Sequence, residues 1–479
     1  MRIILAVDFG STYTKIAAFN VEDEKLIGVA QSPTTIEDDI TIGVDRAMSM
    51  LRARHGRQIE NVDKILACSS AAGGLRMVAV GLVKALTVKA AEEAALGAGA
   101  KLIKTYSYGL TMEDIVEIEQ ISPDMILLCG GTDGGNKDFI LNNSALLSES
   151  RLDVPYIVAG NRMASAEAKG LLERGGKFAV VEENVLPDLD QLNVEPTRER
   201  IRDIFMKRIT HAKGIDKANK IVGNVIMPTP MAVQKGASLL AEGYENEGGL
   251  GDLVVVDVGG ATTDIHSVAN GAPSRPNIIV KGIPDPYRKR TVEGDLGIRY
   301  NALSILEMAG EKKLFELIRA YHHEVSDNFE LEAKVRHLSQ NVGYVPESVE
   351  DHALDSVLAR TAVDTAMQRH AGRLDEVFLS CGRAYIQRGK DLTRVKAVIG
   401  TGGVFVRGRD PFWILTAALF NRRHPDSLRP AQPVLAVDKS YLLYAVGLLA
   451  EVAPLAAIRI MKNQALITEG SSQPNHVSF

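Results

Sequence analysis

The chain contains very little cysteine. Cys68, Cys129 and Cys381 are the only three among 479 residues, and they lie far apart in the sequence. A disulfide framework needs more cysteines than this, and cysteine-ligated metal sites usually contain pairs with Cys-x-x-Cys spacing. The cysteine content therefore argues against a disulfide-stabilised fold and gives no indication of a metal site.

An excess of positive charge and a long apolar run are also missing. The 55 basic and 60 acidic residues are spread along the chain, with a formal net charge of -5, so nothing predicts nucleic-acid binding. The longest apolar stretch, residues 441–458, contains Glu451 and Pro454 and falls short of the ~20 residues of a membrane span. We interpret it as a buried helix. The apolar run in residues 1–8 is too short for a signal peptide, so we expect a cytoplasmic protein with no nucleic-acid or membrane partner.

The residues that are present suit a globular chain of mixed α/β class. Hydrophobic residues make up 46% of the chain, enough for a well-filled core, and the length allows two or three domains. Short β-branched runs alternate with longer segments of helical period, which favours partly parallel sheets. A polar glycine-rich stretch at 245–251 is the best candidate domain boundary, and the polar tail 464–479 is expected to fray.

Hydrophobic periodicity and the breakers between periodic segments place the main elements. We expect strands at residues 3–7, 64–67, 125–129, 156–158, 253–258, 278–280 and 395–399. We expect helices at residues 40–54, 88–96, 111–120, 164–173, 196–208, 231–242, 354–370 and 441–450.

Two segments roughly half a chain apart share one design. The strings ILAVDFGST at residues 4–12 and VVVDVGGATT at 254–263 each form an apolar strand that ends in aspartate, followed by glycine and small hydroxyl residues. Such a repeat predicts two similar lobes that face one ligand.

The first loop has the residue types of a phosphate site. Gly10 lets the backbone approach a polyphosphate closely, and the amides and hydroxyls of Ser11 and Thr12 can donate to its oxygens. Lys15 supplies a compact positive charge, and Asp8 at the end of the strand suits a hydrated Mg²⁺ ion. The alternative interpretation is a simple β-turn with a hydroxyl-rich second strand.

The second loop repeats this pattern and adds a carboxylate. Asp257 is a second candidate for the water shell of the metal, so Asp8 and Asp257 are the candidate metal residues. Asp264 either orients or deprotonates an attacking water, or it caps a turn; Asp8 and Asp264 are the candidate catalytic residues. The residues that can clamp phosphate from the opposite side are Gly259, Gly260, Thr262 and Thr263. We expect both metal residues to lie at solvent-facing strand ends in a cleft.

A third glycine turn follows a late strand, in the string VIGTGGVF at residues 398–405. Glycines at this place let a flat base and a ribose lie directly on the backbone. Strand–glycine turns are common, so we interpret this one as an adenosine site only because the two aspartate loops precede it. The candidate adenosine-binding residues are Gly400, Thr401, Gly402 and Gly403.

Together these loops resemble the ATPase pattern shared by actin, sugar kinases and heat-shock chaperones. The resemblance includes two connecting helices at 230–243 and 441–449, where Ala445 and Gly447 would permit a close crossing. It implies an α/β fold of two ribonuclease-H-like lobes, with ATP and Mg²⁺ in the cleft between them. The implied division is 1–244 for the first lobe with an insertion at about 68–215, 252–440 for the second lobe with the adenosine loop, and 441–479 for a helix crossing back to the first lobe plus a polar tail.

One position departs from that pattern. In the chaperones a glutamate stands beside the Pro-Thr pair before the first connecting helix, whereas here Met227 precedes Pro228 and Thr229. More weight therefore falls on the two candidate catalytic aspartates. The acidic turn VEGDLG at residues 292–297 resembles a turn near the nucleotide in the superfamily; a capped helix start is the alternative.

Four longer strings resemble a narrower family, MutL/GlmL, the accessory proteins encoded with glutamate mutase. The resemblance implies a partner, an adenosylcobalamin-dependent carbon-skeleton mutase or aminomutase. It also implies a task, the ATP-driven reactivation of that partner by release of damaged cobalamin. The strings are CSSAAGGLRM at 68–77, LGAGAK at 96–101, CGGTDGGN at 129–136 and RTVEGDLG at 290–297.

Residues 130–136 allow two interpretations. Their glycines can expose amides to an anion around Asp133, or they can form a tight surface turn after a buried strand. Because the superfamily pattern already has three loops at its ATP site, we favour a role specific to the family, at a surface for the partner.

Three other functions fit parts of the sequence. A small-molecule kinase of the sugar-kinase type uses the same lobes and loops but needs an aspartate base that we cannot identify. An actin-like scaffold would bind ATP and assemble with itself. An ATP-driven electron activator would need cysteines for an iron–sulfur cluster, and the three cysteines lie in different contexts.

Overall fold

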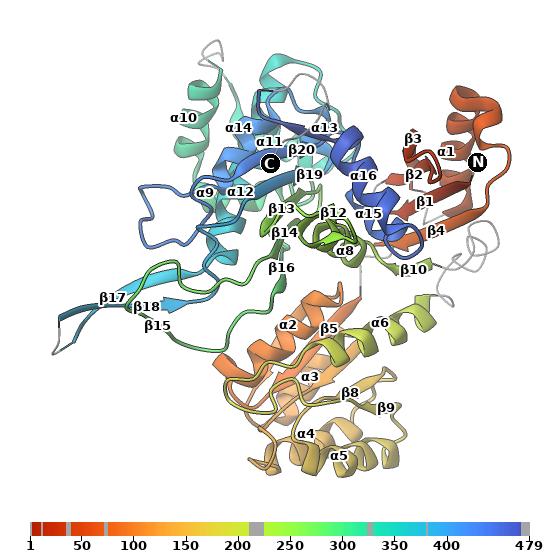
Figure 1. Ribbon diagram of the computed structural model, residues 1–479. Coiled ribbons are helices and arrows are strands. Elements are labelled where there is room, and N and C mark those ends of the chain that lie inside the picture. Colours follow the sequence, from red (N-terminus) through yellow and green to blue (C-terminus); the bar gives the residue numbers. More distant parts are fainter. Residues whose placement is uncertain are drawn as a thin grey trace.

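The computed structural model describes residues 2–10, 13–34, 40–70, 75–209, 225–322, 329–379 and 382–470. Two mixed sheets lie in the upper part of Figure 1, and a third, parallel sheet lies below them. No helix in the described part of the chain is long and apolar enough to cross a membrane.

The first sheet contains five strands in the order β10-β4-β1-β2-β3. Strand β2 runs antiparallel to β1 and β3, whereas β4 runs parallel to β1 and to β10. Every residue of β1 is buried, as expected for a strand covered on both faces. The elements are β1 (Ile3–Phe9), β2 (Tyr13–Asn20), β3 (Lys25–Pro33), α1 (Ile40–His55), η1 (Gly56–Ile59), β4 (Lys64–Ser69) and β10 (Val225–Pro228).

The second sheet repeats this order and adds a sixth strand at its edge, β16-β14-β13-β19-β20-β21. In both sheets the first strand has an antiparallel neighbour on one side and a parallel neighbour on the other. The predicted α/β fold with two ribonuclease-H-like lobes is therefore confirmed. The strands are β13 (Leu253–Val258), β14 (Thr263–Val268), β16 (Arg288–Glu293), β19 (Ala397–Thr401), β20 (Val434–Asp438) and β21 (Leu466–Thr468).

Helices cover the second sheet, and a small sheet projects from it. The long helix α12 begins with a capping box in which Ser348 and Asp351 satisfy each other's backbone amides. Its apolar residues join those of β13 and β14 in one core. The helices are α9 (Ala302–Ala309), α10 (Glu311–Tyr321), α11 (Leu331–Gln340), α12 (Val349–His370), α13 (Gly403–Arg407), α14 (Pro411–Leu415) and η4 (Thr416–Ala418). The projecting sheet consists of β15 (Ile278–Val280), β17 (Arg373–Leu379) and β18 (Gly382–Arg388).

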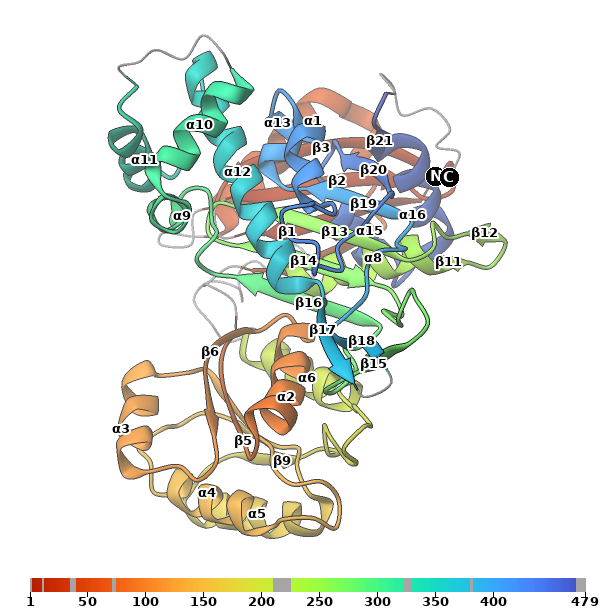
Figure 2. The same cartoon turned by 90° about the vertical axis from the view of Figure 1, so that its left-hand side faces the viewer.

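The segment between β4 and β10, which we call the inserted region, forms its own five-stranded sheet. All neighbouring strands are parallel, in the order β6-β5-β7-β8-β9, which is a doubly wound arrangement. Both views place it beneath β16 of the second lobe (Figures 1 and 2). Its strands are β5 (Arg76–Gly81), β6 (Lys101–Ser107), β7 (Met125–Leu128), β8 (Tyr156–Val158) and β9 (Ala179–Val181), and its helices are η3 (Lys84–Val88), α2 (Lys89–Gly97), α3 (Met112–Ile121), α4 (Asp138–Ser148), α5 (Arg162–Arg174) and α6 (Glu195–Ile209).

Helices α8 (Thr229–Glu242) and α15 (Leu443–Leu449) cross between the two mixed sheets. A Cβ atom on Gly447 would lie 1.8 Å from the carbonyl oxygen of Ala232, and one on Gly236 would lie 2.4 Å from that of Leu443. Only glycine fits at either position, so the small residues permit the close crossing that the sequence predicted.

The stretch 245–251 includes the second strand of a short hairpin, in which β11 (Gly243–Tyr244) pairs with β12 (Glu247–Gly248) before β13 begins. Two sequence expectations need correction. The stretch 441–458 is not one helix but two, α15 and α16 (Pro454–Ile460), because Pro454 starts a new helix. The chain does not fray from Gln464, because η5 (Met461–Ala465) is followed by β21, which pairs with β20. Residues 471–479 lie outside the described part.

Candidate functional site

Asp8 lies at the end of β1 and has three polar neighbours. The Thr229 hydroxyl donates to its Oδ1 at 2.6 Å, and Lys15 Nζ donates to its Oδ2 at 3.1 Å. Cys68 Sγ lies 3.6 Å from Oδ1. The residue is only 1% exposed, so the expectation of a solvent-facing side chain is wrong for Asp8. Neighbouring strands enclose it, and β1 pairs Asp8 with Lys15 on β2 and with Cys68 on β4.

The glycine of the first loop is required by its close backbone neighbour. A Cβ atom on Gly10 would lie 2.5 Å from the carbonyl oxygen of Tyr13 and 3.6 Å from Asp8 Oδ2. The turn therefore presents bare backbone beside the carboxylate. Ser11 and Thr12 lie outside the described residues, so their predicted phosphate contacts stay predictions.

The second loop pairs two aspartates across neighbouring strands. Asp257 on β13 lies opposite Asp264 on β14. The Thr262 hydroxyl donates to Asp264 Oδ2 at 2.8 Å, and the Gly259 amide donates to the Thr262 carbonyl at 2.9 Å. Thr263 is fully buried and its hydroxyl donates to the carbonyl of Leu296, so that side chain points away from the site. Gly260 is partly exposed and free of tight contacts.

Asp257 experiences charges from both lobes. Its surroundings raise its pKa to about 7, first by loss of hydration and then by the nearby Asp264, while Lys15 opposes the shift and Asp8 adds to it. Tyr441 lies in the same place, with Lys15 Nζ 3.8 Å from the centre of its ring. The ends of β1 and β13 therefore lie close enough for their charges to act on each other.

The third loop packs directly on the second. Gly402 has a φ of +104°, and a Cβ atom on it would lie 2.4 Å from the Val258 carbonyl oxygen and 2.9 Å from Asp257 Oδ1. Gly400 is packed against the ring of Phe405, whereas a Cβ atom on Gly403 would meet nothing within 4 Å. Gly403 therefore borders open space beside the two aspartate loops.

Asp438 at the end of β20 explains the buried threonine of the third loop. The Thr401 hydroxyl donates to Asp438 Oδ2 at 3.1 Å, and the amides of Leu442 and Leu443 donate to the same carboxylate at 2.9 Å each. Asp438 thus joins the third loop to the start of α15. The Thr401 hydroxyl points toward Asp438 and away from the open space beside Gly403.

The acidic turn at 292–297 packs against the second loop. Arg369 on α12 donates to Asp295 at 2.8 and 2.9 Å and also donates to Glu293. A Cβ atom on Gly297 would lie 2.3 Å from the backbone of Ala261. The turn therefore packs against the loop after β13, and its proximity to a nucleotide stays a prediction.

Sequence reasoning missed the basic residue that holds Asp264. Arg290 on β16 donates from Nη2 and Nε to Asp264 Oδ1 at 2.7 and 2.9 Å, and the residue is 5% exposed. Next to it, His266 Nδ1 lies 2.9 Å from Gln234 Oε1 of α8. The buried Gln234 Nε2 has no partner among the described residues. Strand alternation in β14 and β16 places these groups on one face, but no local motif marks them.

The donors at this site suit a cation that keeps much of its water. Within the described residues no group of three or more His, Cys, Asp or Glu side chains is close enough to hold a metal. Asp8 and Asp257 are the candidate carboxylates, and Gly403, beside the tightly packed Gly402, borders open space. Mg²⁺ typically takes one or two carboxylates plus waters and phosphate oxygens, so this residue set fits it.

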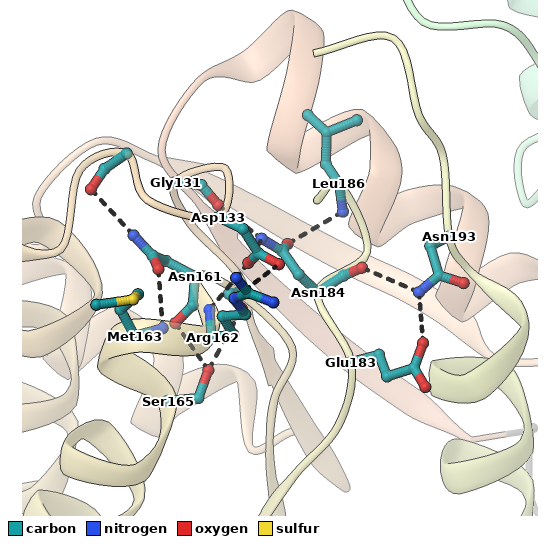
Figure 3. Close-up of polar contacts among 12 residues, drawn as sticks. Gly131, Asp133, Asn161, Arg162, Met163, Ser165, Glu183, Asn184, Leu186 and Asn193 are labelled. Atoms are coloured by element: carbon teal, nitrogen blue, oxygen red, sulfur yellow. Dashed lines mark hydrogen bonds and ion pairs between the residues drawn. The ribbon is translucent and has the colours of Figure 1, made fainter. Parts of the chain in front are cut away.

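The glycine loop at 130–136 follows β7 of the inserted region, and Figure 3 shows the polar contacts around it. Asn161 Nδ2 donates to the carbonyls of Gly135 and Asn136, and Asn184 Nδ2 donates to that of Gly131 and to Asp133. The Asp133 carboxylate also accepts from the Arg162 amide at 3.0 Å. The loop after β7 is therefore tied to the segments after β8 and β9.

The chain is similar to known proteins over nearly its whole length. A family model described as MutL protein matches residues 4–465. Protein MutL of Clostridium tetanomorphum is 46% identical over 463 residues, which are 96% of this chain and 99% of that protein.

Solved structures are more distant. A diol dehydratase-reactivating factor in nucleotide-free form has a TM-score of 0.36 at 10% identity, covering 94% of this chain and 99% of its own. Xylulose kinase from Lactobacillus acidophilus has a TM-score of 0.34 at 10% identity, covering 99% and 94%. Scores this low carry no argument about function. The family match and the close relative are decisive by themselves, and the chain belongs to the MutL protein family.

Proposed function

We propose that the chain binds and hydrolyses ATP in order to reactivate or chaperone an adenosylcobalamin-dependent mutase of the glutamate mutase or aminomutase type. The observation that carries the ATP part is the approach of two aspartate-ended strands from two lobes of one topology, with Lys15 bonded to Asp8 and its charge acting on Asp257. The family membership and its four sequence strings support the choice of partner.

The proposal keeps the domain division expected from the sequence. The first lobe spans 1–244 with the insertion at about 68–215, the second spans 252–440, and a helix in 441–479 returns to the first lobe. Packing of α15 against β1 and β4 supports that return.

In this proposal the phosphates of ATP lie between the loops after β1 and β13. Lys15 provides positive charge, and the Gly260 amide donates hydrogen bonds together with Ser11 and Thr12. The Gly259 amide already donates to the Thr262 carbonyl, so Gly259 contributes a bare backbone next to the phosphates. The turn at 400–403 receives adenosine against its open side. Mg²⁺, held by Asp8 and Asp257 through water, would neutralise phosphate charge. The buried hydroxyls of Thr263 and Thr401 leave those two residues only backbone groups to offer.

Asp264 is held in place by partners on both carboxylate oxygens. Arg290 donates twice to Oδ1, whereas Oδ2 accepts only from Thr262 among the described contacts. Because each carboxylate oxygen has two lone pairs, Oδ2 keeps the capacity to accept from an attacking water. We assign it a water-orienting role that starts when the lobes close on ATP.

Closure of the lobes provides the link to the partner. A ligand shifts a conformational equilibrium only by its difference in affinity for the two states. ATP contacts loops of both lobes in this proposal, so it binds the closed form better, and the mutase is released or engaged according to its contacts with that form.

The test is a coupled assay with an adenosylcobalamin mutase inactivated by turnover. ATP hydrolysis and recovery of mutase activity after addition of fresh cofactor are followed in one tube, with ATP, ADP or a non-hydrolysable analogue. We expect recovery with ATP only. Hydrolysis that depends on a small hydroxyl acceptor, without recovery, would indicate a kinase; ATP-dependent sedimentation without recovery would indicate a scaffold.

A further inference from the structure

One turn of the inserted region contacts the segments that hold Asp8 and Asp264 in place. The turn joins α2 to β6 and occupies the LGAGAK string at 96–101. On one side, Gly99 adopts a φ of +87°, and a Cβ atom on it would lie 3.0 Å from Pro228 Cβ. The next residue, Thr229, donates to Asp8 at 2.6 Å. This side of the turn therefore rests on the start of α8, beside Asp8.

The other side of the turn is bonded to the second lobe. Arg290 Nη1 donates to the carbonyls of Leu96 at 3.1 Å and Ala100 at 3.4 Å, while Nε and Nη2 hold Asp264. A planar guanidinium can bind a carboxylate and carbonyls at once, which a lysine ammonium cannot do in the same geometry. The cation also suits the carbonyl end of helix α2. One buried side chain thus joins Asp264 to the inserted region.

The turn at 96–101 cannot move independently of helices α2 and α6 of the inserted region. A Cβ atom on Gly97 would lie 2.1 Å from Arg198 Nε of α6, and Arg198 donates to the Glu93 carbonyl of α2 at 3.0 and 3.3 Å. Arg198 is 5% exposed. A displacement of the turn is therefore passed to both α2 and α6.

The inserted region is covalently part of one lobe but is anchored on the other. Its ends run into β4 and β10 of the first sheet. Lys89 of α2, however, donates to Asp285 at 2.8 Å, and Ile283 shares the apolar cluster of α2. The region is thus joined to the first lobe through the chain and to the second through side chains, so any change in the relative position of the lobes must be taken up at these contacts.

We propose that Arg290 is a positioning residue for Asp264 and that, with the turn at 96–100, it transmits the nucleotide state of the cleft to the inserted region. This inference rests on the proposed ATP site. Closure of the lobes moves Asp264 relative to Asp8. The turn at 96–100 lies between the residues that hold these two aspartates, so its movement rotates the inserted region. The region then presents a different surface to the partner in the ATP state, which gives the family-specific insertion its function.

The experiment is hydrogen–deuterium exchange of the full chain with and without Mg·ATP. In wild type we expect slower exchange in the loops at 8–15 and 257–264, and an ATP-dependent change in residues 96–101 as well. Arg290→Lys keeps the charge beside Asp264 but loses the forked contact. It should keep the loop protection and lose at least half of the change at 96–101. Arg288→Lys is the matched control, because Arg288 on the same strand pairs with exposed Glu242 at the surface.

The outcomes separate the two proposals. Loop protection in wild type without any change at 96–101, or the full change at 96–101 in Arg290→Lys, would overturn the coupling while leaving the ATP site intact. A lack of loop protection in wild type would contradict the ATP site and the coupling with it. If Arg290→Lys melts well below wild type, Arg290→Gln with Asp264→Asn restores charge balance, and this pair must also lose the change at 96–101.

Discussion

At the scale of single residues, Asp8 and Asp257 look alike in the sequence but have different surroundings. Asp8 is buried and accepts hydrogen bonds from Thr229 and Lys15. Asp257 is partly exposed, has Asp264 opposite it, and has its pKa raised by loss of hydration and by that neighbour. The same substitution should therefore have different effects at Asp8 and at Asp257. Because Asp8 is buried, an isosteric change is the safest probe of its role.

Asp8→Asn should abolish nucleotide handling with little loss of fold. The amide keeps the shape of the side chain and can still accept from Thr229, but it removes the charge that faces Lys15. We expect ATP turnover to fall by about 10²-fold or more, the usual effect of losing one preorganised electrostatic group. Turnover and thermal midpoint are both measured.

Asp23→Asn is the matched control for this substitution. Asp23 is an exposed residue of the same lobe and contacts Asn20, so its loss should leave turnover unchanged. Equal turnover in Asp8→Asn and wild type would rule Asp8 out of the site.

Lys390 gives the folded protein a dependence on pH. Its Nζ is buried and donates to the carbonyls of Pro286 and Tyr287 at 2.8 and 2.7 Å. Burial, followed by repulsion from Lys289, lowers its pKa to about 7. Between that value and the ~10.4 of a free lysine, the unfolded chain binds more protons, so stability rises with pH by up to about 1.4 kcal/mol per unit.

Lys390→Met should flatten the rise of the thermal midpoint between about pH 7 and about pH 9. Lys396→Met, at an exposed position nearby in the chain, should keep the wild-type slope. An unchanged slope in Lys390→Met would show that other groups control the pH dependence.

At the scale of elements, the crossing of α8 and α15 tests the connection between the lobes. Gly447→Ala places a Cβ atom 1.8 Å from the Ala232 carbonyl oxygen, so the helices must separate. Overpacking of this kind costs about 1–3 kcal/mol, and we expect a lower thermal midpoint. Gly248→Ala in β12 is the control, since nothing lies within 4 Å of that Cβ. Equal melting of both variants would contradict the tight crossing.

The sequence predicted some elements well and missed others for physical reasons. Strands β1 and β13 are continuous apolar runs that end at an aspartate and a glycine, which is a strong local signal. Strand β16, with the sequence RKRTVE, carries three basic residues and resembles a surface loop. Its role depends on Arg290 reaching carbonyls 190 and 194 residues earlier in the chain, and no local pattern encodes such a contact.

At the scale of the whole molecule, the repeated loops and connecting helices predicted two lobes, while the inserted region was expected only as a span. Its strands β7 and β8 are short apolar runs that the sequence predicts, whereas β6, with the sequence KLIKTYS, is neither a continuous apolar run nor strictly alternating and was missed. Its docking on the second lobe relies on Lys89 and Asp285, which are ordinary charged residues in sequence. Tertiary pairing over 196 positions can be seen only in the fold.

Asp285 links the inserted region to the second lobe and supports a prediction for the whole chain. Its carboxylate accepts from Lys89 and Lys289, each at 2.8 Å, and is 1% exposed. Burial would raise the pKa of Asp285, but Lys289 and Lys89 outweigh this and hold the pKa below its usual range. The stability that it contributes is therefore present above the ordinary aspartate pKa and is lost as the pH falls toward the folded value.

Asp285→Asn should loosen the inserted region from the second lobe. It leaves buried Lys289 and the partly exposed Lys89 without their counter-charge. Breaking a buried pair such as Lys289–Asp285 costs about 3–5 kcal/mol. We expect faster proteolysis in α2 and in residues 283–289, with ATP protection of the loops at 8–15 and 257–264 retained. Asp375→Asn removes a partner of Arg388 in a half-exposed pair on the projecting sheet, which should cost little. Uniform destabilisation of all three sheets in Asp285→Asn would mean that the ion pair holds the molecule together as one unit, and not that the inserted region is a separately mobile part.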